Sequence, residues 1–198
     1  MKSLIAAALA LASGTTVVTW AAVATAQDCP TGQSAAMGFV VERGEKSKTE
    51  VSRVGDANIR PVLRFGGAPL LETTQFQGLF DLERIDRGTR AVFRPTTDLA
   101  KFFPPNVGKS ITAGFEITES ERQSTLTVIL SVKKLDQLDI GPCRYQVLQI
   151  DRSVGRDGSV PAVRETDYYS PDLKLMIAKE FKGGGGLNKF DRIYLIKR

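Results

Sequence analysis

Residues 165–181, ETDYYSPDLKLMIAKEF, consist of two extended runs that flank a turn. Tyr168 and Tyr169 close the first run, and Ser170-Pro171-Asp172 then turns the chain. Proline presets φ for the second position of a β-turn, and serine and aspartate side chains bond to nearby backbone groups. The stretch therefore predicts a β-hairpin, and the information it carries is structural rather than chemical.

Short runs of the same kind recur along the chain between turn residues. The run Thr125 to Lys134, TLTVILSVKK, is the richest in β-branched residues, and alternate apolar side chains share one of its faces: Leu126, Val128, Leu130 and Val132. Only Leu99 to Phe103 suits a helical turn, and no three-turn amphipathic helix is predicted. The remaining expected strands are 37–43, 48–54, 59–65, 69–77, 79–85, 90–96, 110–118, 143–151, 160–169, 173–181 and 190–196, with loops at 155–158 and 183–186. This pattern predicts an all-β fold in one domain.

The N-terminus has the layout of a secretory signal peptide. Lys2 is followed by an apolar segment, Leu4 to Ala12, and then by small residues suited to cleavage, Ala24-Thr25-Ala26. The alternative is an uncleaved membrane anchor, because residues 3–27 carry no charge and nearly suffice to span a bilayer. We expect cleavage, with a signal peptide over residues 1–26, a β domain over residues 27–198 and no membrane span afterwards.

The composition fits an ordinary globular domain with a modest positive charge. Hydrophobic residues make up 42% of the chain and charged residues 25%. In an exported protein, the net charge of +5 indicates anionic envelope polymers or lipid headgroups rather than nucleic acid. A solvated surface with a small charge imbalance is the preferred interpretation, because the chain has no long basic run. The chain has no histidine, which excludes a His-dependent catalytic triad and a His-ligated metal site.

Cys29 and Cys143 are the two cysteines of the chain. In an oxidising compartment an even pair is typical of a disulfide, which would join the mature N-terminus to the strand that starts near Cys143. A redox or metal-binding pair is the alternative, and it lacks both a CxxC spacing and a third soft ligand.

No group of residues in the sequence makes a convincing catalytic site. Two sets of carboxylates have the spacing of candidate pairs, and both lie beside turns with basic neighbours: Glu116 with Glu119 or Glu121, and Asp136 with Asp139. Glycoside hydrolysis needs two carboxyl groups facing each other across a cleft, so solvated surface charge is the preferred interpretation. We expect no enzymatic activity, no cofactor and no metal.

Four aromatic residues are candidates for a ligand-binding surface: Phe102, Phe103, Tyr168 and Tyr169. In a curved sheet, neighbouring aromatics either fill the core or line an apolar groove. Core filling is the default. A groove for a lipid, or for the hydrophobic segment of a partner, is the functional alternative.

The C-terminal half resembles an uncharacterised family of Gram-negative periplasmic β-domains. The resemblance rests on Leu99 to Lys109, on Ile140 to Arg152 and on DYYSPDLKLMIAKEF, residues 167–181. The family carries a Trp-Tyr-Ser-Pro hairpin, and Tyr168 replaces the tryptophan here. The resemblance implies a single antiparallel, strongly curved sheet or open barrel, similar to the half-barrels of periplasmic lipoprotein carriers. It brings no catalytic residue.

Taken together, these features predict an exported, periplasmic, non-enzymatic protein that binds an apolar or amphipathic envelope ligand on a concave sheet face. The expected partner is an envelope lipid, a lipoprotein or another periplasmic protein. One alternative is an interaction or structural module that pairs through a sheet edge, such as Phe190 to Ile196. A His-independent hydrolase of envelope polymer is the less favoured alternative.

Overall fold

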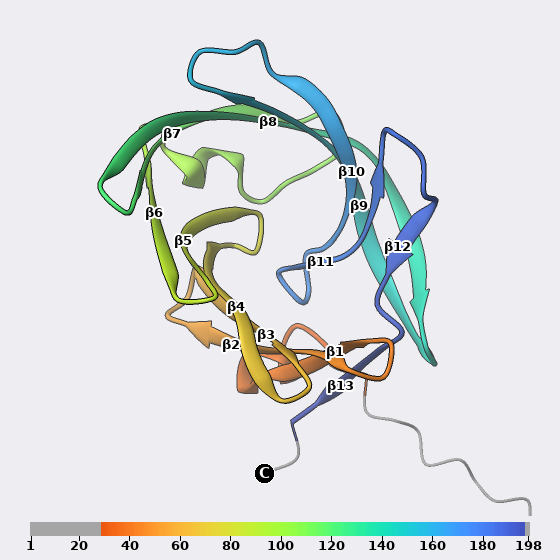
Figure 1. The fold of residues 1–198 in the computed structure, drawn as a ribbon. Helices are drawn as coiled ribbons and strands as arrows, with labels where there is room; N and C mark the ends of the chain where they lie inside the picture. The colour runs from red at the N-terminus through yellow and green to blue at the C-terminus, as the bar shows by residue number, and fades with distance from the viewer. Residues whose placement is uncertain (1–28, 197–198) are drawn as a thin grey trace, which may run out of the picture.

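The computed structural model describes residues 29–196, so the predicted signal peptide lies outside the described residues. Within this range the chain forms thirteen strands in one antiparallel sheet and two short 3-10 turns. Figure 1 shows the strands curling around a common interior, into which the β4–β5 and β10–β11 turns project. The prediction of an all-β fold with one strongly curved, open antiparallel sheet is confirmed.

The elements follow one another in simple order along the chain. They are η1 (Ser34–Met37), β1 (Phe39–Arg43), β2 (Ser47–Val54), β3 (Asn58–Phe65), β4 (Ala68–Phe76), β5 (Phe80–Asp86), β6 (Thr89–Pro95), η2 (Leu99–Phe102), β7 (Ser110–Glu119), β8 (Arg122–Ile140), β9 (Cys143–Arg156), β10 (Ala162–Ser170), β11 (Leu175–Phe181), β12 (Leu187–Lys189) and β13 (Arg192–Leu195). Strands β1 to β12 are neighbours in sequence order, and β13 pairs with β1 at the opposite side. The two edge strands, β12 and β13, are therefore joined through Phe190 and Asp191 alone.

Several predicted segments differ from the structure. The strands expected at 125–134 and 143–151 are longer, as β8 (Arg122–Ile140) and β9 (Cys143–Arg156). The expected loop at 155–158 begins too early, because Gly155 lies in β9 and pairs with Thr127. A side chain at Gly155 would collide with the carbonyl oxygen of Ser159, so the close return of the chain accounts for the glycine. The expected strand at 190–196 is split, because Phe190 and Asp191 form the connection between β12 and β13.

The core consists of two hydrophobic clusters on the two faces of the β8–β9 pair. On β9, Leu148 and Ile150 belong to one cluster, and Tyr145 and Val147 belong to the other. This division follows from the two-residue period of a strand. We name them the Phe80 cluster (Leu79, Phe80, Leu99, Phe102, Ala113, Phe115, Val128, Leu130, Val132, Leu148, Ile150 and Tyr169) and the Phe39 cluster (Ala35, Phe39, Val41, Val51, Ile59, Ile140, Cys143, Tyr145, Val147, Leu173, Leu175, Ile177 and Ile193).

The predicted hairpin at 165–181 is present as β10 and β11. Its turn uses the side chain foreseen from the sequence, because Ser170 Oγ accepts a bond from the Leu173 N–H at 3.5 Å. The turn packs against the β4–β5 turn, where Gly78 has φ 71° and a Cβ atom would overlap the Lys174 carbonyl. Tyr169 fixes the same contact by donating its hydroxyl to Gln77 O at 2.9 Å.

The predicted disulfide between Cys29 and Cys143 is present, and it links residues 114 positions apart. It fastens the first described residue to the start of β9, next to β13, where Cys143 Sγ lies 3.9 Å from Ile193 O. Close by, the backbone N–H of Asp191 donates to Glu42 O at 2.8 Å. The edge strands β12 and β13 are thus joined by the backbone of Phe190 and Asp191 and not by a strand ladder. Among residues 29–196 no helix is long and apolar enough to cross a membrane.

The contact between the two inward turns predicts an unequal effect of two glycine substitutions. Gly78 and Gly88 both have positive φ, 71° and 88°, but only Gly78 has backbone within contact distance of an added Cβ. Gly88→Ala is expected to lower the free energy of unfolding by about 1 to 2 kcal/mol, the strain of a left-handed backbone. Gly78→Ala is expected to lower the free energy of unfolding by the same strain and by a further amount of about 1 to 3 kcal/mol, because the new Cβ overlaps the Lys174 carbonyl. Urea unfolding of both variants checks this, and equal losses would contradict the turn contact.

Loss of the disulfide is expected to destabilise the protein strongly. For a loop on the order of 100 residues, the chain-entropy model gives about 4 to 5 kcal/mol. We expect Cys29→Ala with Cys143→Ala to lower the urea midpoint by an amount that corresponds to most of this energy. The reduced wild type is the matched control and should show the same shift. Coincident unfolding curves for oxidised and reduced protein would show that the bond contributes nothing.

Candidate functional site

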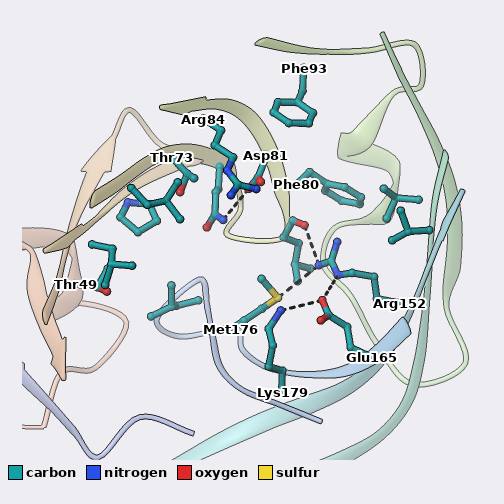
Figure 2. A pocket seen from close by; sticks show the side chains of 18 of the residues that line it. Thr49, Thr73, Phe80, Asp81, Arg84, Phe93, Arg152, Glu165, Met176 and Lys179 are labelled. Carbon is teal, nitrogen blue, oxygen red and sulfur yellow. Dashed lines mark hydrogen bonds and ion pairs between the residues drawn. The ribbon is translucent and has the colours of Figure 1, made fainter. Parts of the chain in front are cut away.

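A cavity of about 630 Å³ lies within the curve of the sheet. Its size falls in the range of roughly 300 to 1,000 Å³ that is typical of small-molecule sites. Every strand from β1 to β11 contributes at least one lining residue, so the wall depends on the curvature of the whole sheet. Figure 2 shows polar and apolar side chains facing each other across this space.

One wall of the cavity is apolar and half-buried. Pro61 and Leu63 on β3 and Leu71 on β4 line it, together with Phe93 on β6 and Leu126 on β8. These side chains keep part of their surface accessible, whereas Phe80 beneath them is 2% exposed. The wall therefore presents apolar surface that no other part of the described chain covers, and burying such surface is favourable for a ligand.

The floor of the cavity holds a cluster of charges, which we name the Arg152 cluster: Arg152, Glu165, Asp167 and Lys179. Its members lie on three neighbouring strands, and the register places Arg152 opposite Glu165 and Asp167 opposite Lys179. Arg152 Nε is 2.6 Å from Asp167 Oδ2, and Lys179 Nζ is 2.9 Å from Glu165 Oε1. Opposite charges directly across a ladder attract, so the cluster holds β9, β10 and β11 in register.

Arg152 also reaches beyond the sheet. Its Nη2 donates to the carbonyl oxygen of Leu79 at 3.1 Å and lies 3.5 Å from the sulfur of Met176. Burial lowers the pKa of Arg152, but the charges of Asp167 and Glu165 outweigh it and the pKa is raised. The guanidinium therefore stays charged while it anchors the β4–β5 turn to the floor. Figure 2 shows Arg152, Glu165, Met176 and Lys179 converging on this point.

The charged side chains that line the cavity are mainly basic. Five are basic and two are acidic: Arg43, Arg84, Arg152, Arg156 and Lys179, against Asp81 and Glu165. Arg84 and Arg156 also line an adjoining hollow of about 180 Å³, which places them where the two spaces meet. The site can therefore hold an apolar group against one wall and attract negative charge.

The four aromatics singled out from the sequence lie in the core around the cavity, and none of them lines it. Phe102 and Tyr169 are 1% and 2% exposed in the Phe80 cluster, and Phe103 packs edge-on against Phe102 with ring centroids 5.4 Å apart. Tyr168 packs against the Phe39 cluster. Their proposed contact with a ligand stays a prediction.

Sequence reasoning missed the charged floor, although one signal pointed to it. Glu165 and Asp167 precede Tyr169 at two-residue spacing, so both acids share a strand face with an aromatic that is buried. Acidic residues on a buried face need a basic partner, because an unpaired buried charge is strongly unfavourable. Arg152 on the preceding strand is that partner.

The carboxylates paired from the sequence lie on the surface with basic partners. Gln137 N–H and Lys134 hold the pKa of Asp136 below its usual value, and Arg144 does the same for Asp139. Within residues 29–196, no group of three or more acidic or cysteine side chains is arranged to hold a metal ion. No residue in this range is therefore assigned as a metal ligand.

The fold is similar to that of solved bacterial proteins. The hypothetical lipoprotein YmcC from Escherichia coli K12 superposes with a TM-score of 0.50 and 12% sequence identity, over 83% of this chain and 90% of that one. A protein with a YmcC-like fold from Bacteroides fragilis gives a TM-score of 0.37 and 8% identity, over 79% of this chain and 92% of that one. No family model and no curated protein matches the chain. The similarity to YmcC supports the resemblance to an envelope β-domain family at the level of the fold, and the Tyr-Ser-Pro motif and the similarity to lipoprotein carriers stay predictions.

The Arg152 cluster predicts a large effect for one carboxylate and a small effect for another. Asp167→Asn removes the charge nearest to a buried guanidinium, and breaking such a pair costs about 3 to 5 kcal/mol. Asp139→Asn is the matched control, because its ion pair with Arg144 is exposed and exposed pairs contribute little. Denaturant unfolding compares the two variants. A loss for Asp167→Asn as small as that for Asp139→Asn would show that the cluster is not a structural anchor.

Proposed function

We propose that this protein is an exported, non-enzymatic envelope protein that binds one amphipathic molecule in the cavity of its curved sheet. The observation that carries the proposal is the lining of the 630 Å³ cavity, which combines a half-buried apolar wall with a charged floor. A ligand with an apolar chain and a polar end matches both surfaces. Sites for small molecules are mostly apolar with a few placed polar groups. This cavity is more polar than that, with thirteen apolar and eleven polar or charged lining residues, which suits a ligand that is itself part apolar and part polar.

Two observations support placement in the envelope. The N-terminal residues have the layout of a signal peptide. The protein of similar fold from Escherichia coli is described as a lipoprotein, a class that is exported from the cytoplasm. The proposal places the mature domain in the periplasm.

The alternative functions have less support in the same structure. Edge pairing needs an accessible strand, and the two edge strands, β12 and β13, have only three and four residues. Short edges are a common way of preventing such pairing. A hydrolase needs carboxyl groups free to act, but Glu165 binds Lys179 and Asp81 accepts a bond from Gln75 Nε2 at 2.8 Å. We therefore favour ligand binding in the cavity.

Binding of a neutral fluorescent probe tests the proposal. N-phenyl-1-naphthylamine is apolar and brightens when it leaves water, so the wild type should bind it saturably at one site per chain. Leu63→Trp adds bulk to a side chain that lines the cavity and is expected to weaken binding by about tenfold or more, since overpacking costs about 1 to 3 kcal/mol.

Val62→Trp is the matched control, because adjacent strand residues point to opposite faces and Val62 does not line the cavity. It should bind the probe as the wild type does. Failure of the folded wild type to bind the probe, or equal weakening by both tryptophans, would contradict binding in the cavity.

A further inference from the structure

We infer that the cavity selects an amphiphile that has one apolar chain and an anionic head. The head is a phosphate or a carboxylate, and Arg152 binds it. This inference rests on the proposed function and names the class of ligand that the same site takes. Its basis is the arrangement of donors and charges in the cavity.

Arg152 has donor capacity to spare on the side of the cavity. Its Nε and Nη2 are taken by Asp167, Leu79 and Met176. Its Nη1 makes no hydrogen bond to residues 29–196, and this nitrogen is not sealed from solvent. The Arg152 side chain is only 13% exposed, but Nη1 keeps accessible surface in the cavity that Arg152 lines, and its hydrogens are free to bond a ligand there. A guanidinium nitrogen without a partner at the cavity surface is suited to an anionic oxygen, because charge-assisted bonds are about twice as strong as neutral ones.

Both acidic residues of the lining already have partners, and Asp81 accepts a hydrogen bond from Gln75 Nε2 at 2.8 Å. Glu165 is already bound by Lys179 Nζ at 2.9 Å, and Arg152 Nε lies 3.5 Å from the same oxygen. Arg43 and Arg156, by contrast, have no ion pair within residues 29–196. The uncompensated charge of the cavity is positive, and a low-dielectric wall focuses the field of such charges on the interior.

Arg84 and Arg156 are placed to draw an anion into the site. Both line the cavity and the smaller hollow that adjoins it, so their charges act where the two spaces meet. Arg84 bonds Asp86 through Nη2 at 3.0 Å, and its other nitrogens bond no residue within 29–196. A cationic head would be repelled by the same arginines.

The size of the cavity limits the apolar part of the ligand. A volume of about 630 Å³ holds one ligand of ordinary small-molecule size. The apolar wall formed by Pro61, Leu63 and Leu71 runs along two adjacent strands, which suits a single extended chain. A free inorganic anion would satisfy Arg152 and leave that wall uncovered.

Competition among amphiphiles that share one chain tests the inference. Dodecyl phosphate, dodecan-1-ol and dodecyltrimethylammonium, each below its micelle concentration, are titrated against bound N-phenyl-1-naphthylamine. We expect dodecyl phosphate to compete about tenfold or more better than dodecan-1-ol, with the ammonium weakest, because a hydrogen bond to a charged group contributes about 1.5 to 3 kcal/mol. Inorganic phosphate, tested alone by calorimetry, is expected to bind far more weakly than dodecyl phosphate.

The variants avoid Arg152, because it also anchors the fold. Arg84→Gln with Arg156→Gln is expected to reduce the preference for dodecyl phosphate over dodecan-1-ol about tenfold, with the melting temperature nearly unchanged. Arg94→Gln is the matched control on the exposed side of β6 and should keep the preference.

Each outcome separates the inference from the function on which it rests. Equal competition by the three amphiphiles would overturn the anionic head and leave ligand binding standing. Inorganic phosphate binding as tightly as dodecyl phosphate would overturn the requirement for a chain. A folded protein that binds neither the probe nor any amphiphile would overturn the proposed function itself.

Discussion

The buried ion pair between Arg152 and Asp167, with nitrogen and oxygen 2.6 Å apart, is the interaction on which the interior of this protein depends. Taking a guanidinium and a carboxylate out of water is unfavourable by several kcal/mol per ion, and the attraction offsets this only when geometry and hydrogen bonds are complete. The pair therefore contributes more to the positions of the surrounding elements than to the free energy of unfolding. Through Leu79 O it holds the β4–β5 turn inward, and through Glu165 it orders the floor of the cavity.

The curvature that creates the cavity has a second origin at the ends of the sheet. Strands β1 to β12 follow in order, and the chain then passes through Phe190 and Asp191 to place β13 beside β1. A sheet whose two edges are joined by so short a connection has to curl. The Cys29–Cys143 disulfide fastens the start of the described chain at the same place, so the unfolded chain loses much of its freedom there.

The sequence was informative where a feature depends on neighbouring residues. The alternation in TLTVILSVKK predicted the buried face of β8, and Ser170-Pro171 predicted the turn of the hairpin. The cavity was not predictable in this way, because each of eleven strands contributes one to three lining residues and no local pattern marks a side chain that faces unfilled space. Phe102 and Tyr169, two of the aromatic candidates for a ligand surface, are buried in the core, which is the default expected of such aromatics from the sequence.

The central claim is our proposal that the space inside the curved sheet holds a bound molecule. Native mass spectrometry of the mature protein, purified from its envelope without added detergent and followed by extraction of bound lipid, tests the claim most directly. The predicted result is a stoichiometric adduct that yields a single-chain anionic amphiphile on extraction. A folded, disulfide-bonded chain that carries no adduct and takes up none when such amphiphiles are supplied would contradict it.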